Sequence, residues 1–316
     1  MKKNLKIIFA GTPEFAVPTL NILHKEEFQI SLVLTQPDSK SGRGMALKSS
    51  RVKQRAKELG IPFFQPEKLN NQDVFNKIKN LHADILVVAA YGLIIPTKIL
   101  SIFKKGAYNV HASILPSWRG AAPIHRAIEA GDSKIGVTIM SIAPTLDTGD
   151  MVRTKSINLN KDSNTGEMTK IISKLGSELM LKVIQDIELN KTLRFIKQDS
   201  SVATYANKVV KSEAKVIWKD TKSRNLVRKI NAFNPFPGMF CIFKGKVTKI
   251  WKASEGKFLD ETEPGKLYLN HEKNIFFIGT QDSVIEIKEI QLEGKRKMNA
   301  NEFIISSDID GTEYFL

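Results

Sequence analysis

Three side chains that can donate hydrogen bonds or transfer protons lie in the middle of the chain. Asn109 and His111 belong to a short β-prone run, and its alternation places both side chains on the same side of a strand. Asp147 lies in a Leu-Asp-Thr-Gly loop that follows a strand expected at 136–142. We therefore expect a polar site at the ends of parallel strands, where open α/β sheets bind ligands. The alternative is structural, because single histidines often pack in cores and Asp-Thr-Gly is a common turn.

The elements that must position these residues alternate between strands and helices. Strands are expected at 5–10, 29–35, 62–65, 85–90, 107–111 and 155–159, and helices at 13–25, 52–59, 71–81, 123–130 and 164–189. The nearly continuous apolar run at 83–90, interrupted only by Asp84, is typical of a strand buried on both faces. This order predicts an α/β domain with a mostly parallel, doubly wound (Rossmann-like) sheet and helices on both faces. The turn after the first strand lacks the G-x-G-x-x-G pattern, so it does not indicate dinucleotide binding.

The pattern changes after the proline-rich break at 234–238. Beyond it, short apolar runs joined by glycine-bearing turns predict a small all-β, OB-like barrel. We expect a catalytic domain at 1–189, a linker at 190–207 and a C-terminal barrel domain at 208–316.

Basic residues outnumber acidic ones along the whole chain. The 316 residues carry a net charge of +15, which favours a polyanionic partner such as nucleic acid. A lysine-rich proteome is the alternative, so clustering of the charge is more informative than its total. One cluster spans 40–57 and begins in a Gly-rich loop, 36–50, expected to lack regular structure. The other spans 208–229, where eight cations and two acids give a net charge of +6.

Composition also limits the class of protein. The hydrophobic content of 42% is that of a globular domain, and no apolar run reaches the roughly 18–20 residues of a membrane span. The single cysteine, Cys241, excludes an intramolecular disulfide, and we expect a cytoplasmic protein. The five histidines lack ligand spacing, so no metal site is expected.

The central motif resembles the folate-dependent formyltransferases. The matching residues are Asn109-x-His111-x-Ser113-x-Leu115-Pro116 and Leu146-Asp147-Thr148-Gly149-Asp150, and the segment 118–124 is similar to the methionyl-tRNA formyltransferases in particular. Further matches extend the resemblance over essentially the whole chain, at 11–16, 35–44, 91–94, 204–208, 231–238 and 293–298. The chain departs from the usual pattern at Arg51, Ile114, Ser117, 143–145 and Ile217, and Arg51 and Ser117 bear on RNA contact.

The resemblance implies transfer of a formyl group from 10-formyltetrahydrofolate to the α-amine of methionine on initiator tRNA. Asn109 is then expected to donate a hydrogen bond to the developing oxyanion, a contribution of about 10²–10³ in rate. His111 adds a second donor, and Asp147 orients or charges His111 and relays protons through a water. No covalent intermediate is needed, and none of the serines stands in a nucleophile pattern.

The resemblance and the charge pattern also imply binding residues. Folate is expected to contact Val88, Leu93 and Ile95 and the turn formed by Ser113, Ile114, Leu115 and Pro116. Contacts with the tRNA are expected from Arg43 in the inserted loop and from Lys208, Lys211 and Lys215. We expect a monomer, with tRNA and folate as its partners and no membrane association.

Three other functions fit parts of the pattern. A formyltransferase of the same fold that acts on a nucleotide-sugar amine would share the central motif, but the basic inserted loop and the small β domain argue against it. A glycinamide ribonucleotide enzyme would lack the region beyond about 206. A non-catalytic RNA-binding protein would not need Asn109, His111 and Asp147 together.

Overall fold

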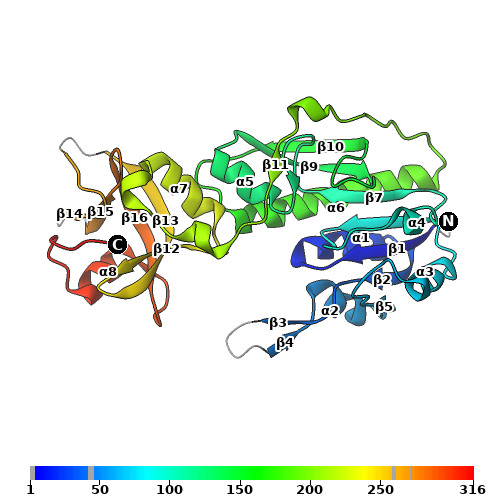
Figure 1. Ribbon diagram of the computed structural model, residues 1–316, viewed down its shortest axis with the longest axis horizontal. Coiled ribbons are helices and arrows are strands. Elements are labelled where there is room, and N and C mark those ends of the chain that lie inside the picture. Colours follow the sequence, from blue (N-terminus) through cyan, green and yellow to red (C-terminus); the bar gives the residue numbers. More distant parts are fainter. Residues whose placement is uncertain (1–3, 42–45, 258–260, 271, 273) are drawn as a thin grey trace. The chain divides into compact units, whose positions relative to one another are not determined.

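The computed structural model describes residues 4–41, 46–257, 261–270, 272 and 274–316. Contacts between residues divide the chain into two compact units, whose elements are labelled in Figure 1. The first unit comprises Met1–Pro123, Lys134–Ile157 and Thr169–Tyr205, and the second Ile124–Ser133, Asn158–Met168 and Ala206–Leu316. Two segments that precede position 208 in sequence, 124–133 and 158–168, therefore pack with the C-terminal residues.

A seven-stranded sheet organises the first unit. Its strand order is β10 (Met151–Asn158), β9 (Lys134–Ser141), β7 (Ala107–His111), β6 (Ile85–Ala89), β1 (Lys6–Gly11), β2 (Gln29–Leu34) and β5 (Phe63–Phe64). Neighbours from β5 to β7 pair in parallel, whereas β7 pairs with β9 in antiparallel fashion. Every residue of β6 is buried, as its unbroken apolar run predicts for a strand covered on both faces. The predicted mostly parallel sheet is confirmed.

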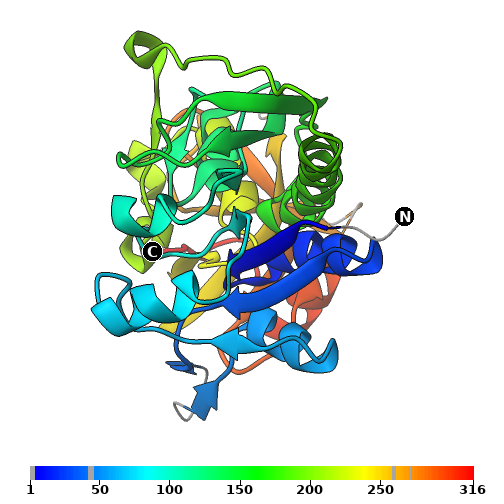
Figure 2. The same cartoon turned by 90° about the vertical axis from the view of Figure 1, so that its right-hand side faces the viewer.

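Helices cover both faces of this sheet. Figure 2 shows α1 (Val17–Lys25) and α6 (Thr165–Glu188) on one side of the strands. On the other face, α3 (Gln72–Lys79) and α4 (Thr97–Leu100) pack into a core formed with alternate residues of β1, β2 and β6. The remaining short elements are η1 (Glu14–Ala16), α2 (Arg51–Glu58), β8 (Arg119–Gly120), η2 (Ser200–Val202) and β11 (Tyr205–Ala206).

The loop at 36–50 differs from its prediction. Within it, β3 (Ser39–Ser41) pairs in antiparallel fashion with β4 (Ala46–Lys48), so the expectation of no regular structure was wrong. A hairpin satisfies its own backbone hydrogen bonds, which polar and Gly-rich composition does not reveal. Arg43 lies among residues 42–45, outside the described part of the chain.

The boundaries of two later elements were predicted with different success. The strand expected at 155–159 begins earlier, at Met151, and ends at Asn158. Most of its residues are exposed or only half-buried, so it lacks the apolar run by which buried strands are recognised. The helix expected at 164–189 is confirmed as α6.

The second unit is built around an antiparallel sheet. Its strands run in the order β12 (Met239–Phe243), β13 (Lys246–Gly256), β16 (Val284–Leu292), β15 (Ile275–Gly279) and β14 (Leu267–Asn270), with β17 (Met298–Asn299) beside β16. The chain end closes the sheet into a barrel. Ile242 and Leu316 exchange two backbone hydrogen bonds of 2.7 and 2.8 Å, and Leu267 N donates to Glu313 O at 2.9 Å.

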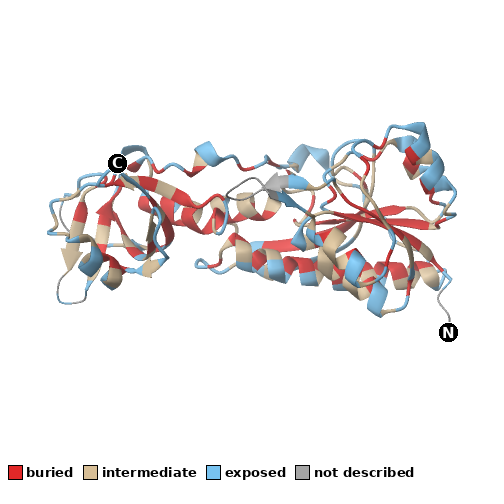
Figure 3. Ribbon diagram, turned by 90° about the horizontal axis from the view of Figure 1, so that it is seen from below, coloured by how far each residue is buried: buried red, intermediate tan, exposed pale blue. Residues whose placement is uncertain are grey.

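Aromatic side chains fill this barrel. Phe243, Phe276, Phe303 and Phe315 are almost completely buried, and their ring centroids lie 4.6–6.4 Å apart. Figure 3 shows that buried residues recur along these strands. The unit also contains the helical elements α5 (Pro123–Ala130), η3 (Lys211–Ala214), η4 (Trp218–Asp220), α7 (Ser223–Ala232) and α8 (Ala300–Ser307). The patterning did not predict α8, although Asn299 and Glu302 form the capping box that begins it.

Candidate active site

Strand β7 brings Asn109 and His111 onto one face of the sheet. The neighbouring Val110 points to the opposite face, where its side chain meets α6 at Gly176. Asn109 is half-buried and His111 is 5% exposed, so both stand at the end of a strand that is otherwise closed to solvent. The predicted shared face is confirmed, and it places an amide and an imidazole side by side.

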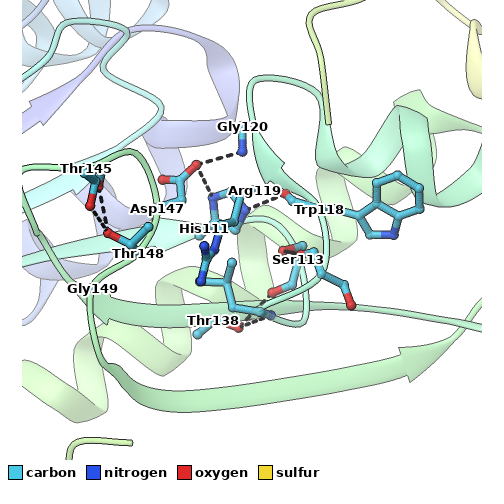
Figure 4. Close-up of polar contacts among 12 residues, drawn as sticks. His111, Ser113, Trp118, Arg119, Gly120, Thr138, Thr145, Asp147, Thr148 and Gly149 are labelled. Carbon is cyan, nitrogen blue, oxygen red and sulfur yellow. Dashed lines mark hydrogen bonds and ion pairs between the residues drawn. The ribbon is translucent and has the colours of Figure 1, made fainter. Parts of the chain in front are cut away.

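Asp147 reaches this pair from the loop after β9. Its backbone has φ of 53°, a left-handed conformation that aspartate tolerates better than most residues. Its Oδ2 accepts a hydrogen bond from the Gly120 backbone N–H at 2.8 Å and lies 3.6 Å from His111 Nδ1 (Figure 4). The hydrogen bond from the Gly120 N–H therefore holds the carboxylate beside the imidazole.

The other nitrogen of His111 has a fixed role. Its Nε2 lies 2.9 Å from the carbonyl oxygen of Trp118 (Figure 4). A carbonyl oxygen only accepts hydrogen bonds, so Nε2 carries a hydrogen and donates it. Nδ1 is consequently the nitrogen that gains or loses a proton, and it faces Asp147. This arrangement suits proton exchange between a substrate and the His111–Asp147 pair.

The loop that carries Asp147 fits tightly against β9. Gly149 is buried, and a Cβ atom there would lie only 1.7 Å from the carbonyl oxygen of Ser141. The Ser141 N–H donates to Asp150 O at 2.9 Å, which joins the loop to the strand end. Only glycine allows this approach, and the approach determines where the Asp147 carboxylate lies.

The chain is similar to known formyl transferases over most of its length. Residues 3–184 match the model of the family described as formyl transferase, and residues 208–307 match the formyl transferase C-terminal domain. Methionyl-tRNA formyltransferase of Methylobacillus flagellatus is 42% identical over 96% of this chain and 97% of its own length. The chain belongs to the methionyl-tRNA formyltransferase family. The enzyme of the same name from Coxiella burnetii is 40% identical over 95% of both chains.

A solved structure supports the fold. The sugar 3N-formyl transferase WlaRD, determined in the presence of dTDP and 5-N-formyl-THF, superimposes with a TM-score of 0.67 at 22% identity. The match covers 92% of this chain and 99% of that one. At this identity the likeness establishes only the architecture.

The residues expected to bind folate differ in accessibility. Leu93, Ile114 and Pro116 are half-buried and can contact a ligand directly. The other four lie in the core with at most 8% of their surface exposed, namely Val88, Ile95, Ser113 and Leu115. Thr138 holds the turn in place, because its Oγ1 donates to Ser113 O at 2.8 Å and accepts from Leu115 N–H at 3.2 Å.

Three basic residues of α2 have acidic partners. Lys53 Nζ lies 2.7 Å from Asp38 Oδ2, and this hydrogen bond is the main reason that the pKa of Asp38 falls below its usual range. Arg51 lies 3.4 Å from Glu14, and Arg55 lies 2.7 Å from Glu58. The cations of α2 are therefore partly neutralised by the protein itself.

The lysines at 208–215 differ from the basic residues of α2 in how their charge is compensated. Lys208, Lys211 and Lys215 are exposed, and none of them forms an ion pair with any residue that the structure describes. The carboxylate of Glu213, between Lys211 and Lys215 in sequence, accepts hydrogen bonds from Arg126 at 2.8 and 3.1 Å. This pairing lowers the pKa of Glu213. The three lysines are thus left with uncompensated charge.

Two contacts at the site were missed from the sequence. Gln198 and Thr204 lie in the segment expected to be a linker, yet Thr204 Oγ1 accepts a hydrogen bond from Trp118 N–H at 2.8 Å. Gln198 contacts both Arg119 and the Asp147 loop. The segment has weak periodicity, so no local signal indicates these roles.

The residues that the structure describes contain neither a metal-binding cluster nor a membrane-spanning helix. No group of three or more His, Cys, Asp and Glu side chains among them is arranged to hold a metal ion. Within the same part of the chain, no helix combines the length and apolar character needed to cross a bilayer.

Proposed function

We propose that this protein transfers the formyl group of 10-formyltetrahydrofolate to the α-amine of methionyl initiator tRNA. The observation that carries the proposal is the His111–Asp147 pair, whose buried imidazole lies on the same strand as Asn109, in a chain of the methionyl-tRNA formyltransferase family. The product, formylmethionyl-tRNA, serves translation initiation.

The chemistry needs few protein groups. Asn109 donates a hydrogen bond to the formyl oxygen, which gains negative charge when the neutral amine attacks the formyl carbon. Loss of such a donor typically costs about 10²–10³ in rate. The new bond joins the amine nitrogen to the formyl carbon, and the bond from that carbon to the folate nitrogen breaks.

Proton movement falls to the two remaining residues. The amine loses one proton and the folate nitrogen gains one, so a group that exchanges protons is needed between them. His111 Nδ1 is the free ring nitrogen, and the Asp147 carboxylate stabilises the imidazolium when that nitrogen is protonated. Asp147 keeps its place through Gly120 N–H while the charge on His111 changes.

Folate binding is assigned to the face that holds Leu93, Ile114 and Pro116. These apolar side chains are half-buried, so a flat ring can cover them without displacing the core. Ile94 is 83% exposed beside Leu93 and extends this apolar surface. Val88, Ile95, Ser113 and Leu115 then support the site from beneath.

The tRNA is assigned to the basic residues with uncompensated charge. Lys208, Lys211 and Lys215 neutralise phosphates, and each neutralised phosphate releases counterions. Arg43 belongs to the same proposal as a contact near the aminoacyl end. The amine must reach Asn109, so the body of the tRNA is held by the second unit and its acceptor end by the first.

We further propose that the protein works as a monomer in the cytoplasm. One chain carries all three residues of the site, so the reaction needs no partner copy. Analytical ultracentrifugation at assay concentration should give the mass of one chain, 35.4 kDa.

The test is formyl transfer to Met-tRNA, with free methionine and a nucleotide-linked amino sugar as alternative acceptors. We expect transfer to Met-tRNA alone. Asn109→Ala and Asp147→Asn should each lower kcat by at least about 10²-fold while the melting temperature changes little. Preference for the amino sugar would refute the proposed substrate, and near-normal turnover in either folded variant would remove that residue from the mechanism.

A further inference from the structure

Gln198 connects two parts of the active site that are distant in sequence. Its amide Nε2 donates to the carbonyl oxygens of Asp147 and Gly149, at 2.8 and 2.7 Å. Its Oε1 accepts two hydrogen bonds from the guanidinium of Arg119, at 3.0 and 2.9 Å. Four hydrogen bonds thus use every donor and acceptor of one side-chain amide.

Chemistry fixes the orientation of this amide. Arginine has only donors and a backbone carbonyl only accepts, so Oε1 must face Arg119 and Nε2 must face the loop. A flipped amide would set two donors against each other and an oxygen against two carbonyls. Gln198 therefore has one bonding arrangement, which makes it a rigid connector.

Arg119 anchors the connector in the protein interior. Its side chain is 2% exposed, and a buried guanidinium is stable only when its N–H groups are bonded. Gln198 takes two of these groups, and Ser200 Oγ accepts a third hydrogen bond at 3.2 Å. No carboxylate among the residues described in the structure forms an ion pair with Arg119, so its partners are these neutral groups.

The loop held by Gln198 carries the Asp147 carboxylate. Asp147 and Gly149 are the residues whose carbonyls are bound, and Asp147 Oδ2 lies 3.6 Å from His111 Nδ1. The left-handed backbone at Asp147 is not intrinsically preferred, so contacts must maintain it. The two bonds from Gln198 brace the loop on both sides of Thr148.

We propose that Gln198 is a positioning residue for formyl transfer, fixing the Asp147 loop against Arg119 so that the carboxylate stays beside His111. This inference rests on the proposed function. It assigns a catalytic consequence to the segment at 190–207, which also leads into the second unit. Misplacement of a catalytic group by about 1 Å can lower a rate by about 10²-fold, so loss of the brace should reduce turnover rather than substrate binding.

Two variants distinguish positioning from a general structural role. Gln198→Leu removes all four hydrogen bonds, and kcat should fall by about 10–100-fold with KM for folate and Met-tRNA within about threefold. Gln198→Glu keeps the acceptor for Arg119 but sets a carboxylate oxygen against two carbonyls. A protonated glutamate donates one O–H bond, so kcat of this variant relative to the parent should rise as pH falls. The same ratio for Gln198→Leu should stay flat.

Gln291→Leu is the matched control. The Gln291 carbonyl accepts from Trp251 Nε1 at 2.9 Å and its amide donates to Lys295 O at 2.8 Å, the same pattern within the barrel. This variant should lose stability but keep kcat at saturating Met-tRNA.

Three results would overturn the proposal. These are a folded Gln198→Leu protein with kcat within about threefold of the parent, an effect confined to KM, and a pH-independent rate ratio for Gln198→Glu. If Gln198→Leu does not fold, the pH dependence of the kcat ratio between Gln198→Glu and the parent tests the proposal by itself. Parent turnover on Met-tRNA, measured in the same assay, separates failure of this inference from failure of the proposed function.

Discussion

Replacing Gly149 with alanine tests whether the backbone position of the Asp147 loop sets the reaction rate. The new Cβ would lie 1.7 Å from Ser141 O and 2.7 Å from Ser141 C, both backbone atoms of β9. A carbon and a carbonyl oxygen need about 3.3 Å even in their closest favourable contacts. The loop must therefore move by roughly 1.6 Å, since the strand it meets is fixed in the sheet.

A movement of this size reaches the site directly. Asp147 stands two residues before Gly149, and its contacts with Gly120 N–H and His111 Nδ1 are 2.8 and 3.6 Å long. We expect kcat to fall by about 10²-fold or more, because small displacements of a catalytic group have effects of that order. Overpacking should also lower the free energy of unfolding by about 1–3 kcal/mol.

The assay is single-turnover formyl transfer at saturating Met-tRNA, at a temperature where circular dichroism shows both proteins folded. Gly279→Ala is the control, because its Cβ would meet Glu263 O at 1.9 Å in the barrel, far in sequence from Asp147. It should lose comparable stability and keep its rate. A folded Gly149→Ala protein that turns over within about threefold of the parent would refute the reasoning.

Two further predictions concern charge. Replacing Lys208, Lys211 and Lys215 together with glutamate should weaken tRNA binding and flatten its dependence on salt, because fewer counterions are released; filter binding at about 50 to 200 mM salt measures both. The same change at three exposed lysines of α6, Lys170, Lys174 and Lys182, should leave the salt dependence unchanged. An unchanged salt dependence in the first variant would refute the assignment. Glu213→Gln should lower the melting temperature at pH 7, because the depressed pKa of Glu213 means that its ion pair with Arg126 stabilises the fold above the unfolded-state pKa. The deficit should disappear as pH falls through the lowered folded-state pKa, and a deficit that persists there would point to lost packing.

Local patterns were sufficient for most of the fold. Continuous apolar residues predict the buried strands β1 and β6, and apolar residues at helical spacing over several turns predict α6. Asn109 and His111 could be placed on one face because alternation along a strand is independent of the rest of the protein. Such features depend only on residues that are close in sequence, so one sequence is sufficient to predict them.

Contacts between distant segments could not be predicted in this way. Arg119 and Gln198 are 79 positions apart, and nothing in the segment at 190–207 marks one glutamine as different from any other. The hairpin of β3 and β4 was missed for a related reason, since each of its strands is only three residues long. Both features depend on hydrogen bonds whose partners appear only after the chain has folded.

The two basic clusters show most clearly why counting cations in a sequence does not identify an RNA-binding surface. The sequence presents two basic clusters of similar density, but in α2 the side chains of Arg51, Lys53 and Arg55 each have an acidic partner within 3.4 Å. In the second cluster Glu213, which lies between Lys211 and Lys215 in sequence, forms its ion pair with Arg126. A paired cation has less to gain from a phosphate, because its existing partner must first be displaced. The case for RNA contact therefore depends less on the net charge of +15 than on the exposed lysines that precede the barrel.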